Sequence, residues 1–356
     1  MKEAMFYEKL DRMKVRCHLC PNECIILHGK QGKCKVRENQ GGRLFSLVYG
    51  LPCAAHSDPI EKKPLFHFLP GTSTYSIGTP GCNFNCLWCQ NWQISQHGPD
   101  EVECFEMSPQ EVVDNAKAKG CSSISYTYVE PAIFYEYVLD TAKLAKKAGL
   151  KNIMVTNGYL NPEPLKKLYR YIDACNVDLK GFTEELYVKY CGGHLEPILR
   201  NIKTIKDMGV WLELTTLIIP GVNDSKQTIT NLCKWVMKEL GPDTPLHFSR
   251  FFPHYKMADT PPTPPDTLMD AHNIAKKAGI NHVYLGNIDM GDTEDTFCPE
   301  CEKKIIDRNG FITMSKKNIE HGKCGFCKTD IAGVWDDMPT APQKPKRTVK
   351  KISKKV

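Results

Sequence analysis

The sequence of 356 residues lacks long apolar runs of the kind that cross a membrane. No stretch approaches the roughly eighteen apolar residues of a membrane-spanning helix, and the apolar segment Val210–Val222 is interrupted by Glu213 and Pro220. Met1–Cys17 contains no apolar signal core. These absences predict a soluble, cytoplasmic protein, in which the 17 cysteines are reduced thiols or metal ligands rather than disulfides.

Acidic residues are absent from the last part of the chain. Pro339–Val356 holds seven Lys and Arg residues and no Asp or Glu, and the other 40 basic residues are balanced by 41 acidic ones. The net charge of +6 therefore comes from this tail, and the nearly neutral body argues against nucleic acid as a partner. A Pro- and Lys-rich segment buries too little apolar surface to order itself, so residues 338–356 are predicted to form a disordered basic tail.

Eleven cysteines fall into three groups, two of which contain four thiols at metal-ligand spacing. The first group lies in an N-terminal Cys-rich segment, residues 1–70, and either zinc or an auxiliary iron-sulfur cluster suits it. The second four-thiol group lies in residues 291–337 and resembles a zinc ribbon, a segment so small that it needs the metal to fold. These ligands are Cys17, Cys20, Cys24 and Cys34 in the first segment, and Cys298, Cys301, Cys324 and Cys327 in the second.

The third group has no fourth thiol. Cys82, Cys86 and Cys89 form C-x3-C-x2-C in one tight loop, whereas closed metal sites use four side chains. Three ligands leave an iron with free coordination positions, where chemistry takes place. A redox disulfide with a bystander thiol is the alternative, but a dithiol motif needs no third Cys at this spacing. The isolated thiols are predicted to be small buried residues: Cys53, Cys104, Cys121, Cys175, Cys191 and Cys233.

Between residues 71 and 290, strand-like runs alternate with amphipathic helices. One helix begins at the capping box Ser108-Pro109-Gln110-Glu111. Such alternation implies a parallel sheet with right-handed crossovers, and seven units fit a partial or full (β/α) barrel or an open doubly wound sheet. The predicted strands are Tyr75–Gly78, Ser122–Tyr128, Asn152–Thr156, Cys175–Leu179, Trp211–Ile219, Leu246–Phe251 and His282–Leu285.

The three-Cys loop, including the aromatic Trp88 before its last Cys, resembles the cluster motif of the radical S-adenosylmethionine (SAM) enzymes. The resemblance implies an α/β fold with a barrel of the radical SAM type over residues 71–290. It also implies a 4Fe-4S cluster on Cys82, Cys86 and Cys89, with SAM on the fourth iron. In that family one electron splits SAM into methionine and a 5'-deoxyadenosyl radical, which abstracts hydrogen from a substrate.

Several residues at predicted strand ends match SAM-binding stretches of that family. Glu130 matches a Gly-Gly-Glu-Pro segment that receives the SAM amino group, although Tyr128 and Val129 replace the glycines. Its alternative role is a carboxylate at a helix N-terminus. The resemblance also implies that Thr156 and Asn157 contact the methionyl end.

Asp178 and Lys180 resemble a further stretch that contacts the methionyl end. Asp178 would accept from the amino group and Lys180 would pair with the carboxylate. As alternate residues at a strand end, their side chains are expected to face separate partners rather than each other. His254 resembles a His near the adenosyl group, and a solvent-facing loop His is the alternative.

The complete layout resembles the radical enzyme of the AmmeMemoRadiSam system, whose members are also described as pyruvate formate-lyase activating enzyme homologues. The matching segments include Arg16–Asn22, Asp58–Phe68, Gln90–Trp92 and Ile331–Trp335. The resemblance implies Memo-like and AMMECR-type partners and an electron donor of the flavodoxin or ferredoxin type.

We therefore expect a radical SAM enzyme that abstracts hydrogen from an unidentified substrate. A glycyl-radical enzyme activase of the pyruvate formate-lyase activating type is the alternative within this class. An electron carrier and a non-enzymatic zinc-ribbon binding module are alternatives from other classes.

Overall fold

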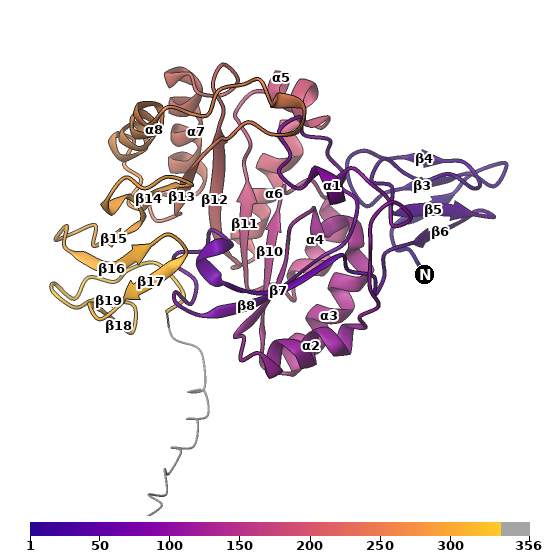
Figure 1. The fold of residues 1–356 in the computed structure, drawn as a ribbon, viewed down its shortest axis with the longest axis horizontal. Coiled ribbons are helices and arrows are strands. Elements are labelled where there is room, and N and C mark those ends of the chain that lie inside the picture. The colour runs from indigo at the N-terminus through magenta and orange to yellow at the C-terminus, as the bar shows by residue number, and fades with distance from the viewer. Residues whose placement is uncertain (336–356) are drawn as a thin grey trace, which may run out of the picture.

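A computed structural model describes residues 1–335, and its centre is a sheet of eight strands in the order β14-β13-β12-β11-β10-β9-β8-β7 (Figure 1). All neighbouring pairs from β8 to β14 are parallel, which confirms the seven predicted strands. Their bounds are Ser73–Gly78 (β8), Ser123–Tyr126 (β9), Lys151–Thr156 (β10), Ala174–Asp178 (β11), Trp211–Ile218 (β12), Leu246–Arg250 (β13) and Val283–Gly286 (β14).

The eighth strand, β7 (Ala54–Pro59), was not predicted and pairs antiparallel with β8. It precedes residue 71, where the predicted barrel begins. Because β7 and β14 form the two outer edges of the sheet, the barrel is partial, as one of the sequence-based alternatives had it.

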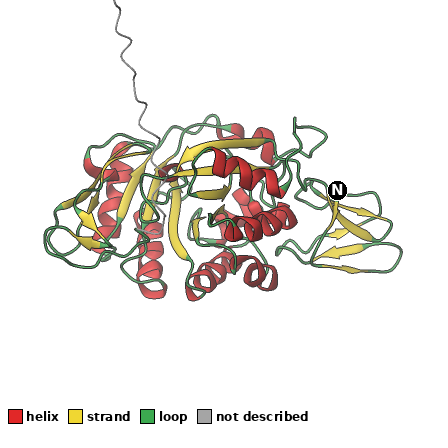
Figure 2. Ribbon diagram, turned by 90° about the horizontal axis from the view of Figure 1, so that it is seen from below, coloured by secondary structure: helices red, strands yellow, loops and turns green. Residues whose placement is uncertain are grey.

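Helices cover the outer face of this sheet (Figure 2). The predicted capping box is confirmed at the start of α2, where Ser108 Oγ accepts from Glu111 N at 3.3 Å and Glu111 Oε2 accepts from Ser108 N at 2.7 Å. The helices of the barrel are α2 (Pro109–Ala118), α3 (Tyr135–Lys147), α4 (Pro162–Tyr169), α6 (Leu195–Asp207), α7 (Lys226–Glu239) and α8 (Pro265–Lys277). Shorter helical turns are η1 (Ile60–Lys62), α1 (Trp92–Ser95), η2 (Pro131–Phe134), α5 (Glu184–Leu186), η3 (Tyr187–Cys191), η4 (Tyr255–Met257) and η5 (Asp292–Glu294).

One buried carboxylate binds the segment after β7 to the amino-terminal halves of β12 and β13. Glu213 of β12 accepts from the backbone amides of Phe66 and His67 at 3.0 and 2.8 Å, and from His247 Nε2 at 2.7 Å. A carboxylate without exposure to solvent requires such partners. This segment therefore lies against the amino ends of the strands. The Cys loop begins at the other edge of the sheet, where the carboxyl ends lie.

Two small Cys-rich modules flank the barrel at opposite ends of the molecule (Figure 1). The N-terminal module consists of β1 (Lys2–Glu3), β2 (Tyr7–Lys9), β3 (Val15–Cys17), β4 (Ile25–Ile26), β5 (Arg37–Gln40) and β6 (Arg43–Ser46). The C-terminal module consists of β15 (Thr296–Phe297), β16 (Lys304–Asn309), β17 (Ile312–Ser315), β18 (Ile319–Glu320) and β19 (Lys323–Cys324). The predicted tail, residues 338–356, lies outside the described residues.

No helix within residues 1–335 combines the length and the apolar character that crossing a membrane requires.

Candidate functional site

The three-Cys loop begins where β8 ends, at the carboxyl edge of the sheet. Cys86 is buried, and Cys82 and Cys89 are half-buried. Hydrogen bonds reach two of these thiols: Phe84 N donates to Cys82 Sγ at 3.4 Å, and Ser95 Oγ of α1 shares a hydrogen bond of 3.1 Å with Cys89 Sγ. Donors of this kind stabilise thiolates and tune clusters bound to them.

Asn83 connects this loop to the end of β10. Its Oδ1 accepts from Asn157 Nδ2 at 2.8 Å, and its Nδ2 donates to the Tyr159 backbone oxygen at 2.8 Å. Asn157 N in turn donates to Glu130 Oε2 at 2.7 Å. The structure therefore brings the Cys loop, Asn157 and Glu130 into one buried network.

Both oxygens of Glu130 are engaged. Oε1 accepts from Ala132 N at 3.0 Å and from Thr156 Oγ1 at 2.8 Å, while Oε2 accepts from Asn157 N. The bond from Ala132 N caps η2, which is the alternative role considered for this carboxylate. A contact between Glu130 and SAM stays a prediction.

Burial raises the pKa of Glu130 to about 7 from its usual value of 4.5, despite these hydrogen bonds. Between these pH values the folded protein keeps a proton that the unfolded chain releases, so the free energy of unfolding falls as the pH rises. At about 1.4 kcal/mol per pH unit, Glu130 should remove about 3 kcal/mol of stability across this window. Chemical denaturation of the apo protein and of Glu130→Gln at several pH values measures this difference. Identical pH profiles would contradict a carboxyl that is protonated by burial.

Asp178 and Lys180 pair with each other, so the expectation of separate partners is wrong. Lys180 Nζ donates to Asp178 Oδ2 at 3.2 Å, because Lys180 lies beyond the last residue of β11 and no longer follows the alternation of the strand. Burial alone would lower the pKa of Lys180, but Asp178 and the nearby Cys86 thiol raise it well above its usual value. A fixed positive charge therefore lies beside the Cys loop.

Cys191 was not identified as part of the site from the sequence. It is buried as predicted, but its thiol lies beside that of Cys86, and its backbone oxygen accepts from Asn85 N at 3.0 Å. This contact and burial raise the pKa of Cys86 well above its usual value. Cys191 was missed because it lies about 100 residues after Cys86 in the sequence. Of the other isolated thiols, Cys53 and Cys104 are half-buried, which corrects the prediction of burial.

Two further predicted residues border the loop. Trp88 is buried, with its ring centroid 6.2 Å from that of Tyr190. His254 precedes η4, and Lys256 N of that turn donates to the Leu87 backbone oxygen at 3.0 Å, which fixes the turn against the Cys loop. His254 Nε2 is buried and has no hydrogen-bond partner within residues 1–335. It therefore remains available to a ligand.

Tyr128 occupies a backbone conformation that favours glycine, at a position where the resembled family carries one. Its φ is +70°, and its side chain is held by a hydrogen bond from its hydroxyl to Asp58 Oδ2 at 2.8 Å. Its backbone oxygen accepts from Asn91 Nδ2 at 2.6 Å. Tyr128 thus adopts the backbone conformation that a glycine would favour at this position.

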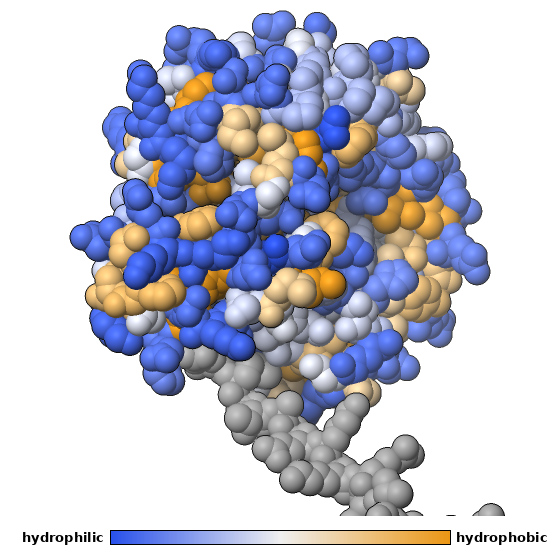
Figure 3. Space-filling model, turned by 60° about the vertical axis from the view of Figure 1, so that its left-hand side comes forward, coloured by the Kyte–Doolittle hydropathy of each residue, from blue (hydrophilic) through white to orange (hydrophobic). Residues whose placement is uncertain are grey.

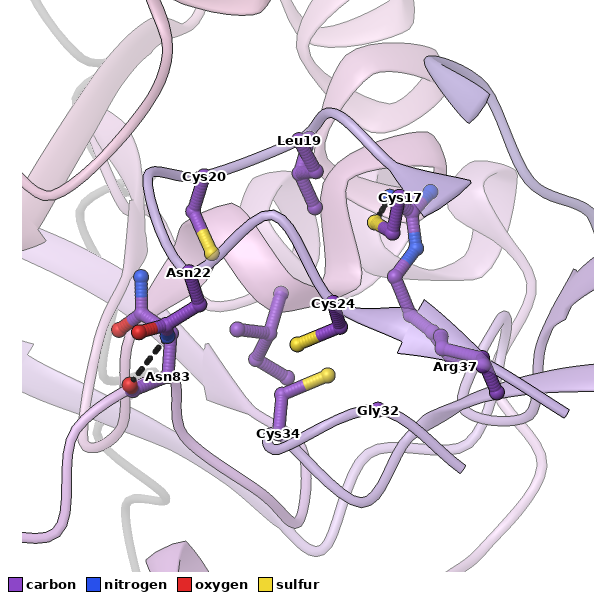
Figure 4. A pocket seen from close by; sticks show the side chains of 11 residues that line it. Cys17, Leu19, Cys20, Asn22, Cys24, Gly32, Cys34, Arg37 and Asn83 are labelled. Carbon is purple, nitrogen blue, oxygen red and sulfur yellow. Dashed lines mark hydrogen bonds between the residues drawn. The ribbon is translucent and has the colours of Figure 1, made fainter. Parts of the chain in front are cut away.

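The four N-terminal thiols line one cavity (Figure 4). Cys24 and Cys34 face each other there, and Cys17 lies beside Arg37, whose Nη1 is 3.6 Å from the Cys17 sulfur. Burial raises the pKa of Cys34 to about 12, and it also raises the pKa of Cys20 and Cys24.

The C-terminal thiols lie much closer together. All four sulfurs are within 4.8 Å of one another, with Cys298 and Cys327 at 3.5 Å and Cys301 and Cys324 at 3.7 Å. This spacing fits a metal ion, because four sulfurs about 2.3 Å from one zinc are about 3.8 Å apart. The surrounding surface is mostly hydrophilic, with apolar patches between charged residues (Figure 3). The module exposes Phe297, Phe311, Ile312, Met314 and Phe326.

Comparisons with known proteins find several relatives of this chain. The chain is 48% identical over 334 residues to an uncharacterised protein of Methanocaldococcus jannaschii, which covers 93% of this chain and 99% of that protein. It is 22% identical to the pyruvate formate-lyase-activating enzyme of Staphylococcus epidermidis, over 46% of this chain and 68% of the enzyme. SAM-bound SuiB of Streptococcus suis aligns with 64% of this chain and 53% of its own, at 11% identity and a TM-score of 0.48.

The family model described as the Radical SAM superfamily matches residues 76–233. This range starts in β8, includes the three-Cys loop, and extends into α7. The family implies a 4Fe-4S cluster and SAM, and the C-terminal thiols fit a metal. Residues 76–233 therefore form a Radical SAM superfamily domain, and members of that superfamily are enzymes that catalyse radical reactions.

Proposed function

We propose that this protein cleaves SAM reductively at a 4Fe-4S cluster held by Cys82, Cys86 and Cys89, and abstracts hydrogen from a substrate. The observation that carries this proposal is the three-thiol loop at the carboxyl edge of a partial barrel. No group of three or more close metal ligands within residues 1–335 includes any of these thiols, so the loop is not a compact closed metal site. The cluster supplies the electron that splits the sulfonium of SAM, and the protein must bind, orient and shelter both groups.

The residues around the loop fit this cofactor. Phe84 N and Ser95 Oγ would stabilise the thiolates by hydrogen bonds. The Asp178 carboxylate is partly exposed and would accept from the SAM amino group, while Lys180 would pair with the SAM carboxylate. The Asp178 carboxylate and the Lys180 ammonium lie side by side. They would therefore complement the amino and carboxylate groups of SAM, which are also close together.

The remaining predicted contacts surround these groups. His254 presents an unpartnered Nε2 that would donate to or accept from the adenosyl part. The Cys loop would be positioned through Asn83 by the network of Glu130, Thr156 and Asn157. Within this network, Asn157 and Glu130 would lie next to the methionyl end of SAM. Buried Trp88 would exclude water from the loop.

The direct test is an anaerobic assay on the full chain after reconstitution with iron and sulfide. With dithionite and SAM, the protein should release 5'-deoxyadenosine and methionine in equal amounts, and SAM should alter the electron paramagnetic resonance (EPR) signal of the reduced cluster. A cluster whose signal ignores SAM and yields no 5'-deoxyadenosine would overturn the proposal in favour of an electron carrier.

A narrower proposal is that the substrate is a glycine of a protein, as for activases of the pyruvate formate-lyase activating type. The similarity to the Staphylococcus epidermidis activating enzyme supports it. A glycyl radical EPR signal in a candidate partner, generated only with SAM and reductant, would support this reading. Memo-like and AMMECR-type proteins are the first partners to test, together with a flavodoxin- or ferredoxin-type donor.

We also propose zinc as the metal of the C-terminal thiols, because four thiolates at this spacing favour a tetrahedral ion. A non-enzymatic zinc-ribbon module would leave the superfamily domain over residues 76–233 without a role, so we do not favour that alternative.

A further inference from the structure

The N-terminal thiols are spaced differently from the C-terminal ones. Within residues 1–335, the C-terminal set is the one group of three or more potential metal ligands whose donor atoms all lie within 4.8 Å of one another. No such compact group within these residues includes the N-terminal sulfurs, although all four line one cavity. A single zinc ion needs sulfurs about 3.8 Å apart, whereas a cluster of several irons holds its thiolates farther from each other.

The three-Cys loop provides an internal reference for this argument. Its thiols also fail to form a group within 4.8 Å, and its family places a 4Fe-4S cluster there. Both of these sets therefore differ from the compact C-terminal set. The chain thus contains two kinds of thiol site, and the N-terminal site is of the kind found in the loop.

The N-terminal cavity is also built to shelter a cluster. Its walls include the buried apolar side chains of Leu19, Ile26 and Ile133, and α3 closes it through an ion pair between buried Arg37 and buried Glu136. Arg37 additionally points toward Cys17. Apolar walls with a hydrogen bond to a ligand sulfur limit water access and set the reduction potential of iron-sulfur clusters.

One residue belongs to both sites. Asn83 lines the N-terminal cavity, and its backbone oxygen accepts from Asn22 Nδ2 at 2.9 Å (Figure 4). Its side-chain Oδ1 lies 3.9 Å from Cys82 Sγ. At Gly81 a Cβ atom would lie 2.4 Å from the Cys34 backbone oxygen, so the backbones of the two sites are in direct contact. Only one residue therefore separates the N-terminal cavity from a loop thiol.

We propose that Cys17, Cys20, Cys24 and Cys34 hold an iron-sulfur cluster that delivers electrons to the three-Cys site. One electron from a donor of the flavodoxin or ferredoxin type would enter at these four thiols and pass on to the cluster held by the loop, so that the N-terminal cluster would return to its oxidised state. No bond or proton changes place in this transfer. The transfer rests on the proposed function, whereas the identity of the N-terminal metal does not.

The test compares the full chain with Cys20→Ala/Cys24→Ala after anaerobic reconstitution, with Cys104→Ala as the control. The double variant should lose about half of its iron and sulfide if the N-terminal cluster has four irons, or about a third if it has two. Zinc should stay constant, and the SAM-sensitive EPR signal should persist. Unchanged iron with half of the zinc lost would overturn the proposal.

A second measurement needs no variant and so does not depend on the folding of the altered module. Anomalous scattering from wild-type crystals at the iron and zinc edges should place several irons between Cys17 and Cys34, and a single zinc there would overturn the proposal. In the fully reduced wild type, the two EPR signals should broaden each other, and this broadening should disappear in the double variant. Two non-interacting signals would refute electron transfer between the sites while leaving the cluster assignment intact. Absence of 5'-deoxyadenosine would contradict only the proposed function.

Discussion

Replacing Cys86 by alanine should reduce the release of 5'-deoxyadenosine to the level measured without protein. Cys86 is the central thiol of the loop and is buried, so neither solvent nor an exposed side chain can substitute for its sulfur as an iron ligand. The two remaining thiols would not retain a cluster with one vacant position for SAM. The reconstituted variant should therefore lose both the SAM-sensitive EPR signal and the iron of this site.

Two cysteine variants provide matched controls. Cys104 is half-buried, its sulfur donates to the backbone oxygen of Val102 at 3.4 Å, and it belongs to none of the three cysteine groups, so Cys104→Ala should retain full activity. Cys191 touches Cys86 without belonging to the loop, and Cys191→Ala should keep its iron. Full turnover in Cys86→Ala would defeat the proposed function. Loss of the loop iron in Cys191→Ala would instead reveal a fourth thiolate and a closed site.

Removing the C-terminal metal should unfold the module around it while the barrel stays folded. The buried apolar side chains of this module are three isoleucines, Ile305, Ile306 and Ile331, in addition to two of the cysteines. So small a core cannot order a segment of about 40 residues, whereas a structural zinc ion contributes about 10 kcal/mol or more to folding. The contacts of Arg308 with Phe66 and Thr296 alone would not replace it.

Hydrogen-deuterium exchange after treatment with a zinc chelator measures this effect. Amides of residues 296–324 should lose their protection, and those of β8 to β13 should keep it. Cys301→Ser should reproduce the loss without chelator, while Cys233→Ser, a single-thiol variant in the barrel, should not affect the module. Protection that survives complete removal of zinc would show that docking against the barrel is sufficient to fold the module.

The seven parallel strands and the capping box were predictable because both depend on local order in the chain. A strand requires only a short run of suitable side chains, and the box at Ser108 needs a carboxylate three residues later. The antiparallel strand β7 was not predictable, because its sequence Ala-Ala-His-Ser-Asp-Pro has no apolar alternation. It exists because β8 offers an edge with which it can pair.

The contacts of individual polar residues could not be predicted from the local sequence. Glu130 was identified from its motif, yet its oxygens are occupied by Ala132, Thr156 and Asn157, and two of these residues lie on another strand end. Asp178 and Lys180 were identified but were expected to diverge, because the alternation of a strand was extended past its last residue. Side chains choose partners by position in space, and sequence spacing describes that position only within one element.

The sequence by itself determined which thiols belong together, since metal ligands from one loop must lie within a few residues of each other, and it determined the strand and helix order of the barrel. The tertiary structure decided that the four C-terminal sulfurs form a compact group, that Cys191 lies beside Cys86, and that Asn83 adjoins both the N-terminal cavity and the three-Cys loop. The contacts of Cys191 and of Asn83 join segments 60 to 110 residues apart in the chain, and packing of the whole fold, rather than a local pattern, brings such segments together.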